Sequence, residues 1–196
     1  MLAQELLEQP KMSNHARGLW GYTGAASGRD LTIQATGMGG PSAAIVLDDL
    51  AELGVRRAIR VGTCIGIESD PGPGDLLTVL EAHAWGGGGT GEPVLPDTDM
   101  TARLRDELGG AGRPAVVASL DVLHQSGVAE SPRYADRVDV ADMQTATLLA
   151  RAETLGVAIA AVLIVAESAS GEQADDEQLE GGAKRAGTAA RALLSA

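Results

Sequence analysis

The feature that most constrains the fold is a repeated unit, a short apolar run rich in β-branched residues followed by a segment with helical periodicity. The clearest unit starts with residues 31–35 and passes through Gly37-Met-Gly-Gly40 to Pro41, which fits a first helical turn because no N–H is needed there. The apolar positions that follow share one helical face: Val46, Leu47, Leu50 and Leu53. Gly54 then favours a C-terminal cap. One complete strand–helix unit is therefore predicted here.

The same unit recurs to the end of the chain. Further strands are predicted at residues 55–62, 75–82, 114–120 and 157–166, and helices at about 100–108, 142–155 and 175–194. The run 157–166 is apolar on both faces, as expected for a parallel strand buried beneath helices. At 196 residues the chain predicts one α/β domain with a largely parallel sheet covered on both sides.

Composition excludes several classes of protein. Lys plus Arg number 15 against 27 Asp plus Glu, a net charge of −12 that disfavours nucleic-acid binding. The longest apolar run, residues 157–166, is short of the roughly 20 residues that a membrane span needs. The N-terminus carries acids where a signal peptide has a basic region, which predicts a cytoplasmic protein. Cys64 is the only cysteine, so neither an internal disulfide nor a thiolate-rich metal site is expected.

Candidate ligand-binding residues are those that follow the strands, because α/β sheets bind ligands beyond the carboxyl ends of their strands. The Gly37-x-Gly39 loop lacks the third glycine of a dinucleotide fingerprint, since Ser42 stands there, and the acid expected about 20 residues later is missing. Arg60, Gly62 and Thr63 instead offer a guanidinium, an N–H and a hydroxyl to one phosphate-sized anion. The alternative is that Arg60 pairs with a surface acid.

Five motifs together carry a family resemblance. They are Arg17-Gly-Leu-Trp-Gly-Tyr-Thr-Gly24, Thr36-Gly-Met-Gly-Gly-Pro-Ser42, Ile59-Arg-Val-Gly-Thr-Cys-Ile-Gly66, Pro73-Gly-Asp-Leu-Leu-Thr78 and Asp142-Met-Gln-Thr-Ala146. In order and spacing they resemble the purine nucleoside phosphorylase and uridine phosphorylase family. The resemblance implies a three-layer α/β/α sandwich with a twisted, mostly parallel mixed central sheet. It also implies homodimers, which often stack into hexamers.

The activity implied by the resemblance is cleavage of the N-glycosidic bond of a nucleoside. Phosphate attacks the anomeric carbon through an oxocarbenium-like state and yields free base and pentose 1-phosphate, which makes the enzyme a pentosyltransferase. Phosphate is a co-substrate, and neither a cofactor nor a metal is implied. Charge placement and positioning would supply most of the rate enhancement.

The resemblance also implies roles for particular residues. Arg60, Gly62 and Thr63 correspond to the phosphate site, and Arg17 corresponds to an arginine that a neighbouring subunit lends to the same phosphate. Met143 corresponds to a methionine beneath the ribose. Gln144 stands where the family has a glutamate that binds the sugar hydroxyls.

At each of three further positions, the role that the resemblance implies has an alternative interpretation. Asp142 stands where the family has another glutamate, and Asp is also a good helix N-cap. Glu167 stands where purine-specific members have the aspartate that protonates the base, and it could equally be a solvated acid at a strand end. His124 is the candidate for the base-stacking ring, since the chain has no Phe, but a histidine on a loop is more often a surface residue.

Departures from the family pattern keep other functions open. Family members begin with a strand and a Gly-Asp-Pro phosphate loop, and residues 1–196 contain no counterpart of them. Gln144 lacks the charge of a glutamate, and Glu167 is one methylene longer than an aspartate, which predicts weaker transition-state stabilisation. The alternatives are a hydrolytic nucleosidase on the same fold and a catalytically weak nucleoside-binding or assembly subunit.

Overall fold

A computed structural model of the chain describes residues 2–67, 71–85, 92–123 and 137–196. Its main sheet contains β4 (Arg57–Gly66), β5 (Leu76–Ala84), β6 (Pro93–Val94), β7 (Gly112–Ser119), β8 (Val140–Asp142) and β9 (Ala158–Glu167). The strand order is β6-β5-β7-β8-β4-β9, and β5 also pairs with β9. Five strands therefore form a closed ring, a closure that the periodicity of the sequence did not indicate.

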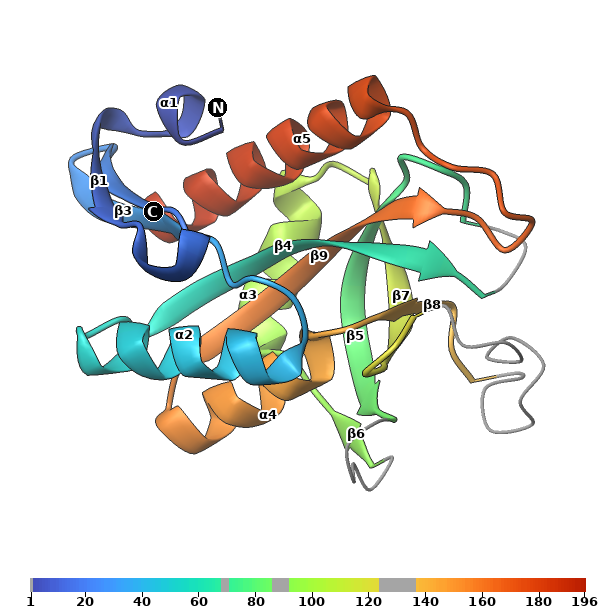
Figure 1. The fold of residues 1–196 in the computed structure, drawn as a ribbon. Coiled ribbons are helices and arrows are strands. Elements are labelled where there is room, and N and C mark those ends of the chain that lie inside the picture. Colours follow the sequence, from blue (N-terminus) through green and yellow to red (C-terminus); the bar gives the residue numbers. More distant parts are fainter. Residues whose placement is uncertain (1, 68–70, 86–91, 124–136) are drawn as a thin grey trace.

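The sheet is mixed in direction. The β4/β9, β5/β7 and β7/β8 pairs are parallel, whereas β4/β8, β5/β9 and β5/β6 are antiparallel. Helices α2 (Gly40–Glu52) and α4 (Thr145–Leu155) pack together on one side, and α3 (Thr98–Glu107) and α5 (Asp176–Ser195) pack on the other (Figure 1). The expected α/β architecture, with a mixed central sheet between helices, is confirmed.

The core is aliphatic, as the scarcity of aromatic residues requires. One cluster joins the sheet to α2 and α4 and includes Leu47, Val117 and Leu163. A second joins the sheet to α3 and α5 and includes Leu104 and Leu193. Small side chains allow this close approach of helix to sheet, since a Cβ on Gly182 of α5 would lie 2.9 Å from Ile164 of β9.

Residues 2–34 form a separate layer beside α5. They comprise α1 (Leu2–Leu6), β1 (Glu8–Asn14), the 3-10 turn η1 (Ala16–Gly18), β2 (Gly21–Ala26) and β3 (Arg29–Gln34). The three strands make an antiparallel sheet, so the predicted strand at residues 31–35 exists but does not pair with the main sheet. Ser27 and Gly28 join β2 to β3 with φ of 52° and 79°, the two left-handed residues of a tight hairpin turn.

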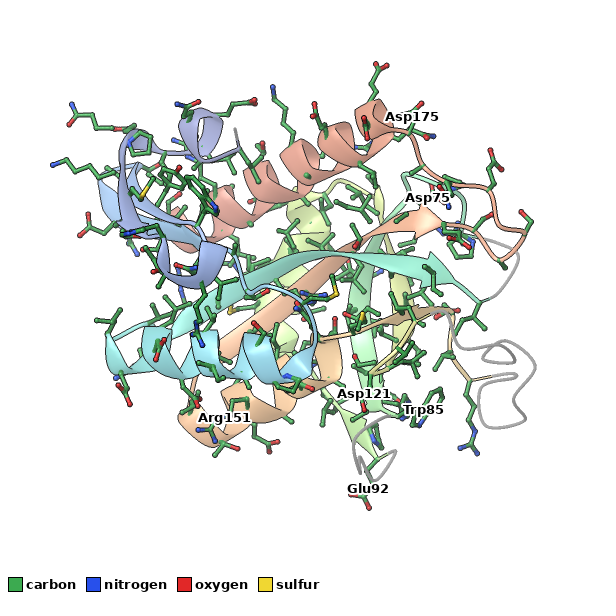
Figure 2. All side chains as sticks on the ribbon, viewed as in Figure 1. Asp75, Trp85, Glu92, Asp121, Arg151 and Asp175 are labelled. Atoms are coloured by element: carbon green, nitrogen blue, oxygen red, sulfur yellow. The ribbon has the colours of Figure 1, made fainter. Side chains whose placement is uncertain are left out.

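Most predicted element boundaries are confirmed to within a few residues, with two informative exceptions. Strand β4 extends to Gly66 rather than ending near residue 62, so Thr63 and Cys64 lie within the strand. The helix predicted from residue 142 begins at Thr145, because Asp142 belongs to β8. Helix α5 begins as predicted: Asp175 and Gln178 form a reciprocal capping box at its N-terminus, where Figure 2 labels Asp175.

One edge of β4 is largely unpaired among the described residues. Its other edge pairs with β9 from Arg57 to Ile65, but toward β8 only Ile65 and Gly66 pair. A cleft of about 650 Å³ lies here, bounded by β3, α2 and β4, and Arg60 contributes to its lining. None of the helices in the described part of the chain is long and apolar enough to cross a membrane.

Candidate functional site

The candidate site is centred on the side chain of Arg60 in β4. All three guanidinium nitrogens donate to the protein: Nη2 to Asp142 Oδ2 at 2.8 Å, Nη1 to Gln144 Oε1 at 2.7 Å and Nε to Thr145 Oγ1 at 2.9 Å. The side chain of Arg60 is 9 % exposed and that of Asp142 is 1 % exposed. Arg60 does pair with an acid, as the alternative proposed, but that acid is buried inside the site rather than at the surface.

Asp142 is held on all sides by hydrogen-bond donors. Besides Arg60, its carboxylate accepts from Ser119 Oγ at 2.5 Å, from Thr145 Oγ1 at 2.6 Å and from the Thr145 N–H at 3.0 Å. The bond to the Thr145 N–H satisfies an orphan donor in the first turn of α4, although the N-cap residue itself is Gln144. The carboxylate thus joins β8, β7 and α4, which is how a buried acid of this kind is stabilised.

Gln144 connects this network to the glycine loop before α2. Its Nε2 donates to the carbonyls of Gly37 at 2.6 Å and Gly39 at 3.4 Å. Its Oε1 accepts from Thr36 Oγ1 at 3.1 Å as well as from Arg60. A carboxylate could accept these two bonds but could not donate the other two. The amide therefore suits this position for a structural reason that the sequence did not indicate.

Gly62 provides the space that Arg60 occupies. A Cβ at Gly62 would lie 2.6 Å from Arg60 Nη2 and 2.7 Å from Cζ, well inside van der Waals contact. Gly62 is half-buried on the same strand, two residues after Arg60. The guanidinium can therefore lie across the strand only where no side chain is present.

The remaining predicted residues are placed as follows. Thr63 is exposed on β4, and Met143 is half-buried between Asp142 and Gln144. Glu167 is the half-buried last residue of β9, opposite Ile65 of β4, and forms an isolated bridge with Gln173. Glu167 thus lies at the carboxyl ends of two parallel strands, the position that the sequence predicted.

One predicted residue, the arginine expected from a neighbouring subunit, belongs to a different part of the fold. Arg17 lies in η1 between β1 and β2, is exposed, and has a φ of 54°, which costs a non-glycine residue some backbone strain. No hydrogen bond joins it to Arg60, Asp142 or Gln144 in the part of the chain that the structure describes. His124, the candidate stacking ring, lies outside the described residues.

The sequence did not identify Ser119, Thr145 and Thr36 as members of the network. Ser119 ends β7 and Thr145 begins α4, so both sit where strand ends meet a helix N-terminus. Thr36 and Thr145 belong to two of the motifs that carry the family resemblance, and Ser119 lies near the end of the strand predicted at residues 114–120. Their positions in the sequence could have identified these three residues. Their residue types could not, because Ser and Thr are common at helix starts in general.

Cys64 is 1 % exposed and packs within β4 as a small buried residue. Burial, with a smaller effect of Asp142, raises the pKa of its thiol. The thiol therefore stays protonated at neutral pH and is a poor nucleophile. Within the described residues no cluster of three His, Cys, Asp or Glu side chains could hold a metal ion.

Comparison with known proteins assigns the family. The model of the phosphorylase superfamily matches residues 1–196 of this chain. The chain belongs to the phosphorylase superfamily. Within it, a DeoD-type purine nucleoside phosphorylase from Oceanobacillus iheyensis is 42 % identical over 77 residues, which cover 39 % of this chain and 33 % of that protein. The matching segment thus spans about a third of that relative.

A longer alignment links the chain to the same superfamily. A DeoD-type purine nucleoside phosphorylase from Bacillus cereus is 29 % identical over 191 residues, covering 90 % of this chain and 80 % of the relative. A solved purine nucleoside phosphorylase from Toxoplasma gondii, in complex with immucillin-H, has a TM-score of 0.87 at 21 % identity, covering 99 % and 84 % of the two chains.

A second solved structure has the same fold. It is a putative methylthioadenosine nucleosidase from Weissella paramesenteroides, with a TM-score of 0.84 at 16 % identity, covering 99 % of this chain and 92 % of the other. These two structures confirm the superfamily fold. At such identities they do not assign a reaction to this chain.

Proposed function

We propose that this chain is a nucleoside phosphorylase that cleaves the N-glycosidic bond of a nucleoside with phosphate, giving free base and pentose 1-phosphate. The observation that carries the proposal is the buried Arg60–Asp142–Gln144 cluster, built from two of the motifs on which the family resemblance rests. Membership of the phosphorylase superfamily supports the same reaction class.

The proposed phosphate site uses the part of Arg60 that the protein does not bind. Arg60 donates three hydrogen bonds to protein oxygens, and a guanidinium has five N–H groups, so one N–H on each Nη nitrogen is left for an anion. Thr63 and the N–H of Gly62 would complete the site within one chain. Arg17 of a neighbouring subunit would contribute a second guanidinium, which requires a homodimer or hexamer.

In the proposed reaction a phosphate oxygen forms a bond to the anomeric carbon as the bond from that carbon to the base breaks. The bonding electrons pass to the base, and Glu167 supplies the proton that neutralises its ring nitrogen. Met143 packs beneath the sugar, Gln144 and Asp142 lie on the sugar side, and His124 contacts the base. The enzyme would act in the cytoplasm with phosphate as co-substrate and without a cofactor.

The test is base release by the purified protein from purine and pyrimidine nucleosides, with and without phosphate. We expect release only with phosphate, and we expect Arg60→Met to abolish it. Arg151→Met is the matched control, because Arg151 of α4, labelled in Figure 2, pairs with Asp48 of α2 instead of with a residue of the site. Absence of base release with every nucleoside contradicts the proposal.

A hydrolytic nucleosidase is the second candidate, favoured by the ion pair between Arg60 and Asp142. Asp142 already balances the charge of Arg60 and would repel a phosphate dianion, whereas water would not be repelled. Base release that is unchanged when phosphate is removed would support this candidate and exclude phosphorolysis.

A catalytically weak nucleoside-binding subunit is the third candidate. It is favoured by Gln144, whose amide already makes four hydrogen bonds to the protein. Calorimetry that shows nucleoside binding without turnover would support it.

A further inference from the structure

Ser119 occupies an unusual place beneath the site. It is the last residue of β7, is 6 % exposed, and its hydroxyl accepts the N–H of Ala146 in the first turn of α4 at 2.9 Å. The same hydroxyl donates to Asp142 Oδ1 at 2.5 Å. The hydroxyl acts as an acceptor in the bond from the Ala146 N–H. Its single hydrogen is therefore available for donation to the Asp142 carboxylate.

The bond from Ser119 fixes the orientation of the Asp142 carboxylate. Oδ1 is bound chiefly by Ser119, and Oδ2 receives Arg60 Nη2, Thr145 Oγ1 and the Thr145 N–H. With both oxygens bound from different elements, the carboxylate plane cannot rotate about its χ2 torsion. Without the Ser119 hydroxyl, Oδ1 would keep one weak bond of 3.3 Å, from the Thr145 N–H.

The orientation of the carboxylate in turn sets that of the guanidinium. Arg60 lies across Gly62 and is held at each of its three nitrogens, so the N–H groups that remain on Nη1 and Nη2 have fixed directions. A guanidinium that is hydrogen-bonded at all three nitrogens loses these fixed N–H directions when one of its partners moves.

We propose that Ser119 is a positioning residue, which acts through Asp142 to aim the two remaining N–H groups of Arg60 at an anionic substrate. The anion part of this inference rests on the function proposed above. The positioning part concerns only the orientation of Arg60, so it can be tested without turnover.

The first measurement is the exchange of the Arg60 Nε–H with water, followed by NMR of protein labelled with ¹⁵N-arginine. In the wild type this N–H is bound to Thr145 and buried, so we expect slow exchange. Ser119→Ala should accelerate it about tenfold, the effect of weakening one hydrogen bond to a charged group. Thr101→Val is the control, because Thr101 Oγ1 in α3 is buried and has no hydrogen-bond partner among the described residues.

The second measurement separates positioning from general stability. In Ser119→Ala we expect the KM for phosphate to rise about tenfold while the KM for nucleoside stays within twofold of wild type. A merely structural role would lower the folded fraction and leave both KM values unchanged.

The two measurements fail in different ways. Unchanged Arg60 Nε–H exchange in Ser119→Ala overturns the positioning role, whatever the kinetics show. A wild-type protein that releases no base refutes the proposed phosphorolysis, and the exchange experiment still decides whether Ser119 orients Arg60.

Discussion

Arg60 Nη2 and Asp142 Oδ2 lie 2.8 Å apart in an ion pair whose side chains are 9 % and 1 % exposed. The two residues come from β4 and β8, strands that pair only at Ile65 and Gly66. The pair therefore adds a side-chain link between these two strands outside their short ladder. Its burial makes each partner dependent on the other, because a lone charge at this depth has no water to stabilise it.

Asp142→Asn should lower the free energy of unfolding by about 3–5 kcal/mol, because it leaves the charge of Arg60 buried and uncompensated. Urea denaturation of the two proteins measures the difference. Asp48→Asn is the matched control. It removes the partner of Arg151 from a pair whose side chains are 36 % and 39 % exposed, and water screens that pair. Equal losses in the two variants would show that burial does not set the strength of the Arg60 pair.

Gly62→Ala should displace the guanidinium of Arg60, since the new Cβ would lie 2.6 Å from Nη2. We expect a loss of about 1–3 kcal/mol in stability and a loss of any anion-dependent activity. Gly181→Ala in the exposed part of α5 is the control. Nothing lies within 4 Å of that Cβ, so alanine should stabilise the helix by about 0.5–1 kcal/mol. A Gly62→Ala protein as stable as wild type would contradict the close approach.

Gln144→Glu restores the acid of the family pattern, yet it should destabilise this chain. The carboxylate has no N–H for the carbonyls of Gly37 and Gly39, so two partly buried hydrogen bonds are lost and both carbonyl oxygens face a negative charge. A lower thermal midpoint is the expected result. In Gln178→Glu, by contrast, glutamate keeps the bond from the Asp175 N–H in the capping box of α5 and loses only an exposed 3.3 Å bond to the Pro73 carbonyl, so the thermal midpoint should change little. A higher thermal midpoint in Gln144→Glu would contradict the conclusion that the hydrogen bonds of the Gln144 amide connect α4 to the glycine loop.

Cys64 should make folding stability fall at high pH. Burial raises the pKa of its thiol above the ordinary value of 9.0. The folded protein therefore keeps a proton that the unfolded chain loses once the pH exceeds 9. Stability from this group is complete below pH 9 and declines above it, by about 1.4 kcal/mol per pH unit.

The measurement is urea denaturation at pH 7 and pH 10 for the wild type and for Cys64→Ala, which removes the titrating group. The decline between the two pH values should be smaller in the variant. Identical declines in both proteins would assign the effect to other groups.

Much of the fold was predictable because the signals are local. Apolar runs, helical periodicity, Pro41 at a first turn and the Asp175–Gln178 cap each act over a few residues. The separate pairing of residues 31–35 was missed because its hairpin partner, β2, has weak alternation, although Ser27-Gly28 is a recognisable turn. The start of α4 was predicted too early because Asp142 fits the start of a helix, whereas it belongs to β8. The residue type alone does not distinguish the two positions.

The site was predictable only in part. The motifs identified Arg60, Asp142 and Gln144, and the structure brings these three together. Which hydrogen bonds they make was beyond the sequence, since Ser119 lies 23 residues from Asp142 and Gln144 lies 107 residues from Gly37. Such pairings depend on how the strands order themselves in the sheet.

The sequence by itself determined the α/β class, the aliphatic core and the superfamily, because periodicity, composition and motif spacing are properties of the chain alone. The tertiary structure decided that the sheet closes on itself through the β5/β9 pair. It also decided that Arg60 donates three hydrogen bonds to oxygens of the protein itself. The physical reason is that burial and long-range pairing fix the charge and direction of a side chain, and neither exists until distant strands meet.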